Sequence, residues 1–513
     1  MKRSLLAFAA FVLAALLFAQ ATAARNPGGR DFRGAIFSAG VSGKDGPNNP
    51  TLKAPTTLLG SLVRASDDSG VAIPLLPEEL TTSGRVFFDS QTEPWVTVNP
   101  GNTSNVVGMF QEERWSTGGA RNLVLATSFN GGKSWQNIPV RGVGIVAGGE
   151  FQRVTDPWVD FGPNNRVYAT SLGFDDTGPD NAIVVQASTD GGKSWGAPVT
   201  VIKDTQFQFF NDKQALVADD SASSPSEGNV YVTWDRLIDK SGNPFEGNFT
   251  GPAMFSRSTD GGQTFSPPRV IFDTGTNEQT IGNVPVVLRD GTLVVGGTFF
   301  ENGGTEKQQT FFYVVRSTDG GQTFSAPFIV AEEKPVLVRD VRSGDTVPIL
   351  AVDPKTDRIY ATWEDSRFSG GKRDDILVIH SDDGGLTWSQ PAKANDTPPG
   401  AQDAFTPTVA VDANGRVGIL YYDLRDDARF NDDSILTTEW ITFSTDGGQT
   451  WSASQRLTPT FDQTASPFAG GFFLGDYQGL TAAGAVFQPF FAADLLNQAN
   501  GFLGSDIFST RVK

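Results

Sequence analysis

The chain has 513 residues and a formal net charge of -18, with 40 Lys and Arg against 58 Asp and Glu. This acidity argues against nucleic acids and anionic membranes as partners, because both require a basic face on the protein. The absence of Cys excludes disulfides, thiolate metal sites and a cysteine nucleophile, and the single His makes histidine-dependent catalysis a poor expectation. The 57 Gly and 30 Pro lack a collagen period and indicate many turns between short strands.

The N-terminus has the order of a secretory signal. Lys2 and Arg3 precede an apolar run over 5–18, and the small residues Ala21-Thr22-Ala23 follow it. The run is short for a bilayer span, although an uncleaved anchor remains the alternative. We therefore expect cleavage near Ala23, secretion to an extracellular or periplasmic space, and a mature chain that is a monomer without membrane insertion.

Residues 24–83 are weakly patterned and are predicted to form an extended arm or linker. Gly28-Gly29 and Gly46-Pro47-Asn48-Asn49-Pro50 interrupt any regular element. The periodic part of the chain, 84–513, is predicted to be one repeat domain.

An eight-residue motif occurs six times in that domain, and its starts are 60, 70, 59, 64 and 63 residues apart. Self-similarity at such a period is typical of a repeat architecture. Each copy has the form Ser-x-Asp/Asn-Gly-Gly-x-Ser/Thr-aromatic. The copies are SFNGGKSW at 128–135, STDGGKSW at 188–195, STDGGQTF at 258–265 and 317–324, SDDGGLTW at 381–388, and STDGGQTW at 444–451.

The motif predicts a tight hairpin. Gly tolerates the positive φ of such turns, and a carboxylate can accept backbone N–H groups that the turn leaves unpaired. We interpret the acidic position as structural in every copy, because a repeated residue cannot be the unique residue of one active site. These positions are Asn130, Asp190, Asp260, Asp319, Asp383 and Asp446.

Each unit of about 60 residues contains four strand candidates, which is the composition of a β-propeller blade. The sequence therefore predicts an all-β chain of four-stranded antiparallel blades. A last unit offers three strands, at 476–480, 485–492 and 505–511, and lacks a fourth. We predict seven blades, with the N-terminal strand 85–89 as the outer strand of the last one, because an open edge is an aggregation hazard. Six blades is the alternative.

The six motifs resemble the Asp-box, or BNR, repeats of sialidases and related secreted β-propellers. The resemblance covers about 85–513 and implies that the boxes join the third and fourth strands, while ligands bind around the axis at the opposite face. It implies a fold more than an activity, because Asp boxes also occur in other hydrolases, lyases, receptors and assembly factors.

The segments that enter the innermost strands carry six carboxylates and one amide: Glu93, Asp156, Asp212, Asn283, Asp345, Asp403 and Asp476. Crowded carboxylates raise one another's pKa or recruit a cation. Asp156, Asp212 and Asp403 are the candidate metal ligands. The alternative is that each Asp caps its own loop or pairs with a neighbour such as Arg153 or Lys213. Ca²⁺ is the cofactor this pattern allows, also at the acidic stretch 426–433, which lacks EF-hand spacing.

The segments that follow three second strands combine an aromatic residue, a carboxylate and an arginine. Such a rim could hold a sugar by ring stacking and hydrogen bonds to its hydroxyl or carboxylate groups. The alternative is an Asp–Arg pair that pins each loop. The candidate ligand-binding residues are Trp234, Asp235, Arg236, Trp363, Asp365, Arg367, Asp423 and Arg425.

Sialidases, by resemblance, use an Arg triad, a Tyr–Glu nucleophile and an Asp acid. Tyr477, in Tyr477-Gln478-Gly479-Leu480, is the best match to the nucleophile, and Asp476 beside it is a second catalytic candidate. Phe32-Arg33-Gly34-Ala35 departs from the Phe-Arg-Ile-Pro motif of the family. A lyase would need a Tyr or His base, such as Tyr421 or Tyr422, and His380 lies next to a box.

These observations leave three hypotheses. The first is a secreted propeller that binds a carbohydrate or other polar ligand, or a cation, at its axial mouth, with catalysis not established. The second is a glycoside hydrolase of the sialidase type. The third is a surface assembly or adhesion scaffold.

Overall fold

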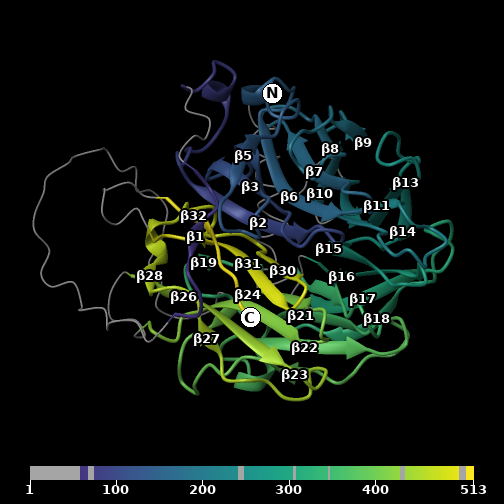
Figure 1. Cartoon of the computed structure of the whole chain (residues 1–513). Helices are drawn as coiled ribbons and strands as arrows, with labels where there is room; N and C mark the ends of the chain where they lie inside the picture. The colour runs from purple at the N-terminus through teal and green to yellow at the C-terminus, as the bar shows by residue number, and fades with distance from the viewer. Residues whose placement is uncertain are drawn as a thin grey trace, which may run out of the picture.

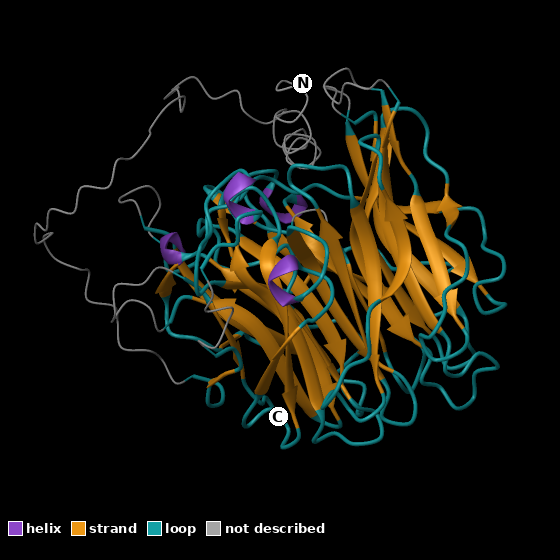
Figure 2. Cartoon of the chain, turned by 90° about the horizontal axis from the view of Figure 1, so that it is seen from above, coloured by secondary structure: helices purple, strands orange, loops and turns teal. Residues whose placement is uncertain are grey.

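The computed structural model describes residues 58–67, 74–240, 248–303, 308–344, 347–427, 434–495 and 504–513. The predicted signal segment lies outside these ranges. Nearly all regular elements of the described chain are strands of mainly antiparallel sheets, joined by loops, and the helical segments are single turns of 3-10 helix (Figure 2). The all-β prediction is therefore confirmed. Within the described residues no helix is long and apolar enough to cross a membrane.

Four-stranded units follow one another along the chain, and in all but the last unit, which includes β1, the four strands pair in chain order. The first strands are β2 (Gln91–Val98), β6 (Arg153–Phe161), β10 (Phe209–Ala218), β15 (Glu278–Val287), β20 (Ile349–Val352), β24 (Ala404–Val411) and β30 (Gly479–Ala483). The second strands are β3 (Val106–Arg114), β7 (Val167–Phe174), β11 (Val230–Asp239), β16 (Leu293–Glu301), β21 (Ile359–Asp365), β25 (Val417–Asp423) and β31 (Val486–Ala493).

The third and fourth strands complete the units. The third strands are β4 (Ala120–Ser128), β8 (Asn181–Ser188), β13 (Ala253–Ser258), β17 (Gln309–Ser317), β22 (Asp375–Ser381), β26 (Leu436–Ser444) and β32 (Asp506–Ser509). The fourth strands are β5 (Gln136–Pro139), β9 (Val199–Asp204), β14 (Arg269–Phe272), β18 (Phe328–Glu332), β23 (Ala392–Lys393), β27 (Gln455–Arg456) and, for the last unit, β1 (Val63–Arg64).

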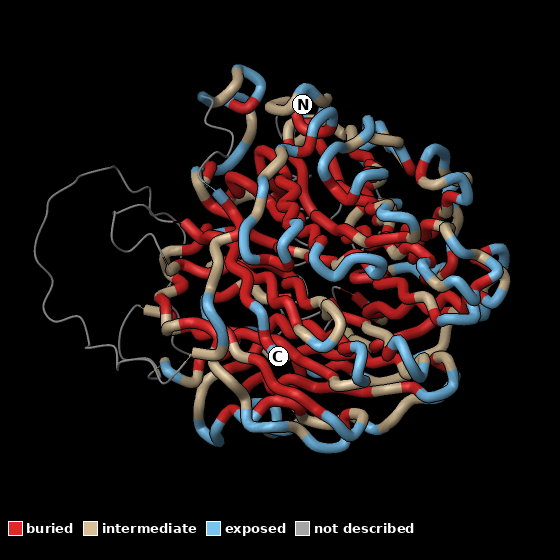
Figure 3. Tube along the Cα trace, viewed as in Figure 1, coloured by how far each residue is buried: buried red, intermediate tan, exposed pale blue. Residues whose placement is uncertain are grey.

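The first strands of successive units contact one another. β2 contacts β6, and the series continues through β10, β15, β20, β24 and β30, which in turn contacts β2. Figure 1 shows the sheets following one another from purple to yellow, with the yellow strands β30 and β31 beside β2. The strands consist mostly of buried residues (Figure 3), and the largest hydrophobic cluster includes residues of the first strands β6, β10, β15, β20 and β24.

The strand that completes the last unit differs from the one predicted. β1 pairs antiparallel with β32, with Val63 opposite Ser509 and Arg64 opposite Phe508. Segment 85–89 instead runs beside the end of β3, where Phe87 N donates to Arg114 O at 2.8 Å. The prediction of 85–89 as the outer strand is therefore wrong. The two-residue β1 has no periodic pattern to reveal it, and it belongs to the segment predicted to be a linker.

Each Asp box lies between a third and a fourth strand, as expected. In the sixth copy, Asp446 Oδ1 accepts the backbone N–H groups of Gln449 and Thr450 at 3.0 and 2.9 Å, and Thr450 Oγ1 donates to Asp446 Oδ2 at 2.5 Å. Gly447 and Gly448 have φ of 76° and 89°, which favours glycine. The hydrogen bond from Thr450, with the other donors, lowers the pKa of Asp446 to about 2.

The boxes also link neighbouring units. The carbonyl oxygen of the first box glycine accepts a hydrogen bond from a polar side chain of the preceding unit. The pairs are Asn105 with Gly191, Arg166 with Gly261, Arg257 with Gly320, Arg316 with Gly384, and Arg358 with Gly447. The last unit has no box, and there Arg416 donates to Ala485 O in the hairpin between β30 and β31.

Candidate functional site

A β-bulge with a left-handed residue interrupts several first strands near their beginning. Glu93, Asp156, Lys213 and Thr406 have φ of 51°, 54°, 46° and 46°, and the register shifts at each of them. Non-glycine residues in this region cost about 1–3 kcal/mol each, and such strain is concentrated at functional sites. The sequence placed these residues in loops, because the bulge breaks the alternation by which a strand is recognised.

Lys213 is the centre of a buried ionic cluster that joins four units. Its Nζ lies 2.6 Å from Asp476 Oδ2, 3.3 Å from Glu93 Oε1 and 3.7 Å from Asp156 Oδ1. Burial opposes the charge of Lys213, but Asp476 and Glu93 outweigh it and raise the pKa of this lysine. Four of the predicted axial carboxylates, Asp212 included, therefore do gather, around a cation of the protein itself.

Two arginines extend the cluster. Arg342 donates to both carboxylate oxygens of Asp476, at 3.0 and 2.6 Å. Arg114 donates to Gln111 Oε1 at 2.6 Å, and within the described chain its buried Nε has no hydrogen-bond partner. Both guanidinium groups lie 4.6 Å from the ring centre of Phe473. Burial lowers the pKa of Arg114 to about 10, so it stays cationic at neutral pH.

Asp156 and Asp212 form a close carboxyl pair. The backbone N–H of Lys213 donates to Asp156 Oδ2 at 3.1 Å and to Asp212 Oδ1 at 3.0 Å. Burial, followed by the charge of Asp156, raises the pKa of Asp212 to about 8. Asp235 lies opposite Asp212 in the β10–β11 register and is buried, and its pKa is also raised, chiefly by burial. Asp212 as a whole residue is half-buried, whereas Asp156 and Asp235 are buried.

These groups line a pocket with two unlike walls. One wall is ionic and includes Glu93, Arg114, Asp156, Asp212, Lys213 and Arg342. The other is apolar, with Leu172, Phe174 and Phe210, and residues 117–119 complete the rim. The rings of Phe174 and Phe210 meet edge to face at 5.7 Å. A site with an apolar face and a few converging charged groups is the usual composition of a small-ligand pocket.

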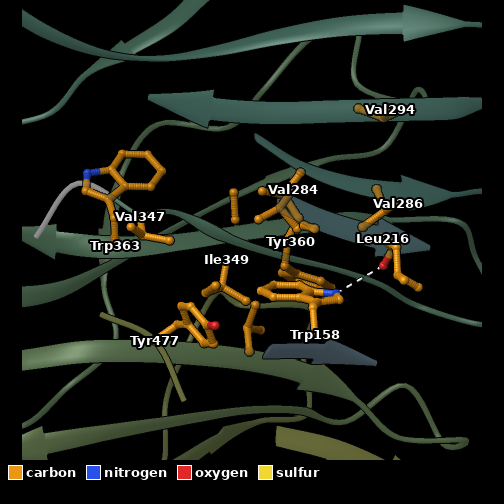
Figure 4. Packing of buried hydrophobic residues seen from close by; sticks show 14 of the residues in the cluster. Trp158, Leu216, Val284, Val286, Val294, Val347, Ile349, Tyr360, Trp363 and Tyr477 are labelled. Carbon is orange, nitrogen blue, oxygen red and sulfur yellow. Dashed lines mark hydrogen bonds between the residues drawn. The ribbon is translucent and has the colours of Figure 1, made fainter. Parts of the chain in front are cut away.

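The hydroxyl of Tyr477 does not line this pocket. Tyr477 is buried, packs edge-on against the stacked rings of Trp95 and Trp158, and donates its hydroxyl to Pro157 O at 3.1 Å. Figure 4 shows Tyr477 in the same core as Trp158. Burial, with Glu93, Asp156 and Asp476, raises the pKa of Tyr477 well above its usual range. In this position Tyr477 is a packing residue, and Asp476 is an ion-pair partner of Lys213 and Arg342.

The three arginines predicted to form a rim lie in separate units, and each pairs with a nearby carboxylate, which for Arg236 belongs to the preceding unit. Arg236 pairs with Asp204 and covers Phe209, and Arg367 makes a two-point contact with Asp365. Arg425 pairs with Asp423 and Asp396 and covers Trp440. The structure therefore does not bring these arginines into one pocket, and their contacts are those of the loop-pinning alternative.

Two aromatic predictions need correction. Trp234 and Trp363 are fully buried, with their indole N–H groups donating to Asn211 Oδ1 at 2.9 Å and Asp365 Oδ2 at 3.2 Å. Neither ring presents a face for stacking on a sugar. An aromatic residue at a strand end looks the same in sequence whether the neighbouring sheet covers it or leaves it exposed.

The proposed metal ligands also separate. Asp403 lies away from the pair of Asp156 and Asp212 and accepts the backbone N–H of Asp374 at 2.8 Å. Asn283 accepts the hydroxyl of Tyr313, and Asp345 is outside the described residues, as are 428–433 of the acidic stretch. Among the described residues, no three His, Asp or Glu side chains are arranged to hold a metal ion.

Sequence reasoning missed the cations of the pocket. Arg114 ends a second strand, Arg342 precedes the fifth unit, and Lys213 was considered only as a neighbour with which one of the predicted carboxylates could pair. One signal was available: Lys213 occupies the bulge position that holds a carboxylate in the two preceding units. The convergence of the two arginines has no signature in a single sequence.

A family model, the BNR/Asp-box repeat, matches residues 442–453, which confirms the repeat recognised in the sequence. No curated protein matches the chain. Among solved structures, the chain is similar to the Hadza microbial sialidase Hz136, with 18% identity, 80% of this chain and 73% of that chain covered, and a TM-score of 0.46.

Two further solved structures are similar to the chain. The α-L-arabinofuranosidase arb93a from Fusarium graminearum has 12% identity, 66% and 92% coverage of this and that chain, and a TM-score of 0.44. The α-L-arabinanase from Penicillium chrysogenum has 10% identity, 89% and 98% coverage, and a TM-score of 0.44.

Proposed function

We propose that the chain is a secreted, sialidase-like Asp-box propeller of seven blades, and that β1 closes its ring. Support for the ring comes from the contact of β30 with both β24 and β2 and from the pairing of β1 with β32. Support for secretion comes from the charged, apolar and small-residue order of 1–23.

The ring binds a glycan that bears a carboxylate, in the axial pocket formed by Arg114, Lys213 and Arg342. The observation that carries this proposal is the convergence of three cationic side chains from different units on one pocket. Lys213 and Arg342 both pair with Asp476, whereas the buried Nε of Arg114 has no hydrogen-bond partner among the described residues. An arginine in this state gains a charge-assisted hydrogen bond when an anionic ligand enters. The Phe174–Phe210 wall provides an apolar face for the sugar ring.

Isothermal titration calorimetry with methyl α-N-acetylneuraminide as the probe tests this proposal. Arg114→Gln keeps the length of a polar side chain and removes the charge, and it should weaken binding by about tenfold or more, since hydrogen bonds to charged groups contribute about 1.5–3 kcal/mol. Arg289→Gln is the matched control, because Arg289 pairs with Asp357 on an exposed surface. No binding to the wild-type protein, or equal loss in both variants, would contradict the proposal.

Hydrolysis of such a glycoside is the second candidate function, and Asp212 is the observation that favours it. Asp212 lines the pocket, and with a pKa raised to about 8 it carries a proton at neutral pH that it can donate to a leaving oxygen. The buried hydroxyl of Tyr477, donated to Pro157 O, does not favour the tyrosine nucleophile that the sialidase resemblance implies.

An aryl sialoside assay across pH 5–10 tests the hydrolase. If Asp212 is the acid, the rate should fall as pH rises through about 8, because the proton to be donated is lost there. Asp212→Asn should abolish turnover and leave binding of the methyl glycoside within a few-fold of wild type. Turnover that survives in Asp212→Asn, or that disappears in Tyr477→Phe while the melting temperature is unchanged, would show that the essential catalytic group is a residue other than Asp212.

A further inference from the structure

The first Asp box departs from the other five in its side chains but not in its turn. Its second position is Phe129, where four other copies have Thr, and its third is Asn130, where all the others have Asp. Asn130 Oδ1 still accepts the backbone N–H groups of Lys133 and Ser134, at 3.0 Å each. The phenylalanine is therefore not needed to form the turn, since the other copies form it with a smaller residue.

The sixth position of the box is a lysine only in the first two copies. These residues are Lys133 and Lys193, whereas the later copies have Gln, Gln, Leu and Gln there. The first copy thus combines a cation with an amide, and every later copy has the carboxylate. Both lysines are exposed, and within the described chain neither side chain pairs with a carboxylate. The box ends of the first two units are therefore less acidic than those of the units that follow.

These side chains form one surface with an arginine of the last unit. Lys193 Nζ lies 5.0 Å from the ring centre of Phe129, so the second box meets the first. Arg511 follows β32, and a side chain on Gly131 of the first box would come within 3.6 Å of the guanidinium carbon of Arg511. Arg511 is exposed and pairs with no carboxylate among the described residues. This surface, the box-end patch, consists of Phe129, Lys133, Lys193 and Arg511.

The chemistry of the box-end patch suits a hydrated acidic polymer better than a protein. The core of a protein interface contains several large apolar side chains. In the described segments 99–106, 128–135, 188–195 and 510–513, Phe129 is the only exposed large hydrophobic side chain. Nucleic acids and anionic membranes have a high density of negative charge, which the net charge of -18 repels. An acidic polysaccharide has fewer charges, and its sugar rings can pack on an aromatic ring between cations.

We propose that the box-end patch binds an acidic polysaccharide, which runs across the box ends of the last, first and second units. The first strands of these units contact one another in that order, so the three cations follow an arc. A monosaccharide would reach only one of the cations, whereas a polymer reaches all three.

The box-end patch lies at the end of the sheets opposite the axial pocket, which therefore stays open when the polymer is bound. The patch would retain the secreted protein on an acidic extracellular polymer, and this inference does not depend on the function proposed for the axial pocket.

Calorimetry with polygalacturonate as the acidic probe and dextran as the neutral one tests the box-end patch. We expect the wild-type protein to bind polygalacturonate at low salt, to bind it less tightly as salt increases, and not to bind dextran. Lys133→Gln, Lys193→Gln and Arg511→Gln combined should weaken binding about tenfold, because an exposed ion pair contributes a few-fold at most. Phe129→Thr, which restores the residue of four other copies, should weaken binding roughly two- to tenfold.

The matched control combines Lys240→Gln, Lys355→Gln and Lys372→Gln, which remove the same charge at exposed positions of other units. It should leave the affinity for polygalacturonate unchanged. Equal losses in the two triple variants, or no binding by the wild-type protein, would overturn the proposal. Single-stranded oligothymidylate that binds at least as tightly as polygalacturonate would overturn the polysaccharide in favour of a nucleic acid.

The two sites can fail separately. The patch variant with three substitutions should bind methyl α-N-acetylneuraminide as the wild-type protein does, because its substitutions lie far from the axial pocket. An affinity for polygalacturonate that falls in Arg114→Gln, but not in the patch variant, would place the polymer in the axial pocket and overturn the box-end patch.

Discussion

The two ends of the sheets differ in how far their side chains repeat from unit to unit. At the box end, the six copies make similar hydrogen bonds within the turn. In five of them the carbonyl oxygen of the first box glycine also accepts a hydrogen bond from a side chain of the preceding unit. At the mouth end, one bulge position holds Glu93, Asp156, Lys213 and Thr406 in successive or distant units. A position that carries the same side chain in every unit maintains the fold. A position that keeps the same backbone conformation but carries a different side chain from unit to unit allows a ring of repeats to form a single site.

We expect removal of Asp476 to cause the largest loss of unfolding free energy, because its ion pairs stabilise the segments around the axial pocket. Asp476→Ala leaves Lys213 and Arg342 buried without their main partner, and breaking a buried ion pair costs about 3–5 kcal/mol. Chemical denaturation measures the loss of unfolding free energy. Asp382→Ala is the control, since Asp382 is 61% exposed in its pair with Arg358, and such a surface pair contributes about 0–1 kcal/mol. Similar losses of unfolding free energy in the two variants would show that the ion pairs of Asp476 stabilise the fold no more than an exposed pair does.

A proline at Ala65 tests whether the N-terminal segment closes the last unit. Ala65 N donates to Ile507 O at 2.7 Å, and Ala65→Pro removes that donor next to β1. We expect a lower melting temperature together with aggregation, because the edge of β32 becomes exposed. Phe87→Pro removes a comparable bond, from Phe87 N to Arg114 O, without exposing β32. Aggregation confined to Phe87→Pro in light scattering would favour 85–89 as the closing strand.

The stability contributed by the box end and by the axial pocket should depend on pH in opposite directions, with smaller effects than those of the substitutions above. The pKa of Asp446 is lowered to about 2, so its contribution is complete above about pH 4 and is lost as pH falls through 2. The pKa of Asp212 is raised to about 8, so its contribution is complete below about pH 4 and is lost as pH rises through 8. Melting temperatures should therefore fall by a few degrees as pH rises from about 4 to 8, and this alkaline decline should level off above pH 8.

Asp212→Asn should flatten that alkaline decline and leave the acid limb unchanged, whereas Asp446→Asn should change the acid limb. The first box already has an amide, Asn130, which accepts the N–H groups of Lys133 and Ser134 at 3.0 Å each, so the fold tolerates this replacement. An alkaline decline that persists in Asp212→Asn would place the titrating group outside the axial pocket.

The box end could be predicted from the sequence because its information is local. Eight consecutive residues specify the turn, the acceptor and the returning aromatic ring, and six repetitions specify the strand count of each unit. The mouth depends on residues far apart in the chain, such as Lys213 and Asp476, whose contact exists only after the first strands are assembled. β1 was missed for a related reason, since two residues carry no period, and its pairing with β32 depends on the packed edge.

A crystal structure of the protein soaked with methyl α-N-acetylneuraminide tests the central claim most directly. The account predicts the sugar in the axial pocket, with its carboxylate in contact with Arg114 and its ring against Phe174 and Phe210. A sugar bound at the box end of the sheets, or at the separate loops of Arg236, Arg367 and Arg425 with the axial pocket empty, would contradict it.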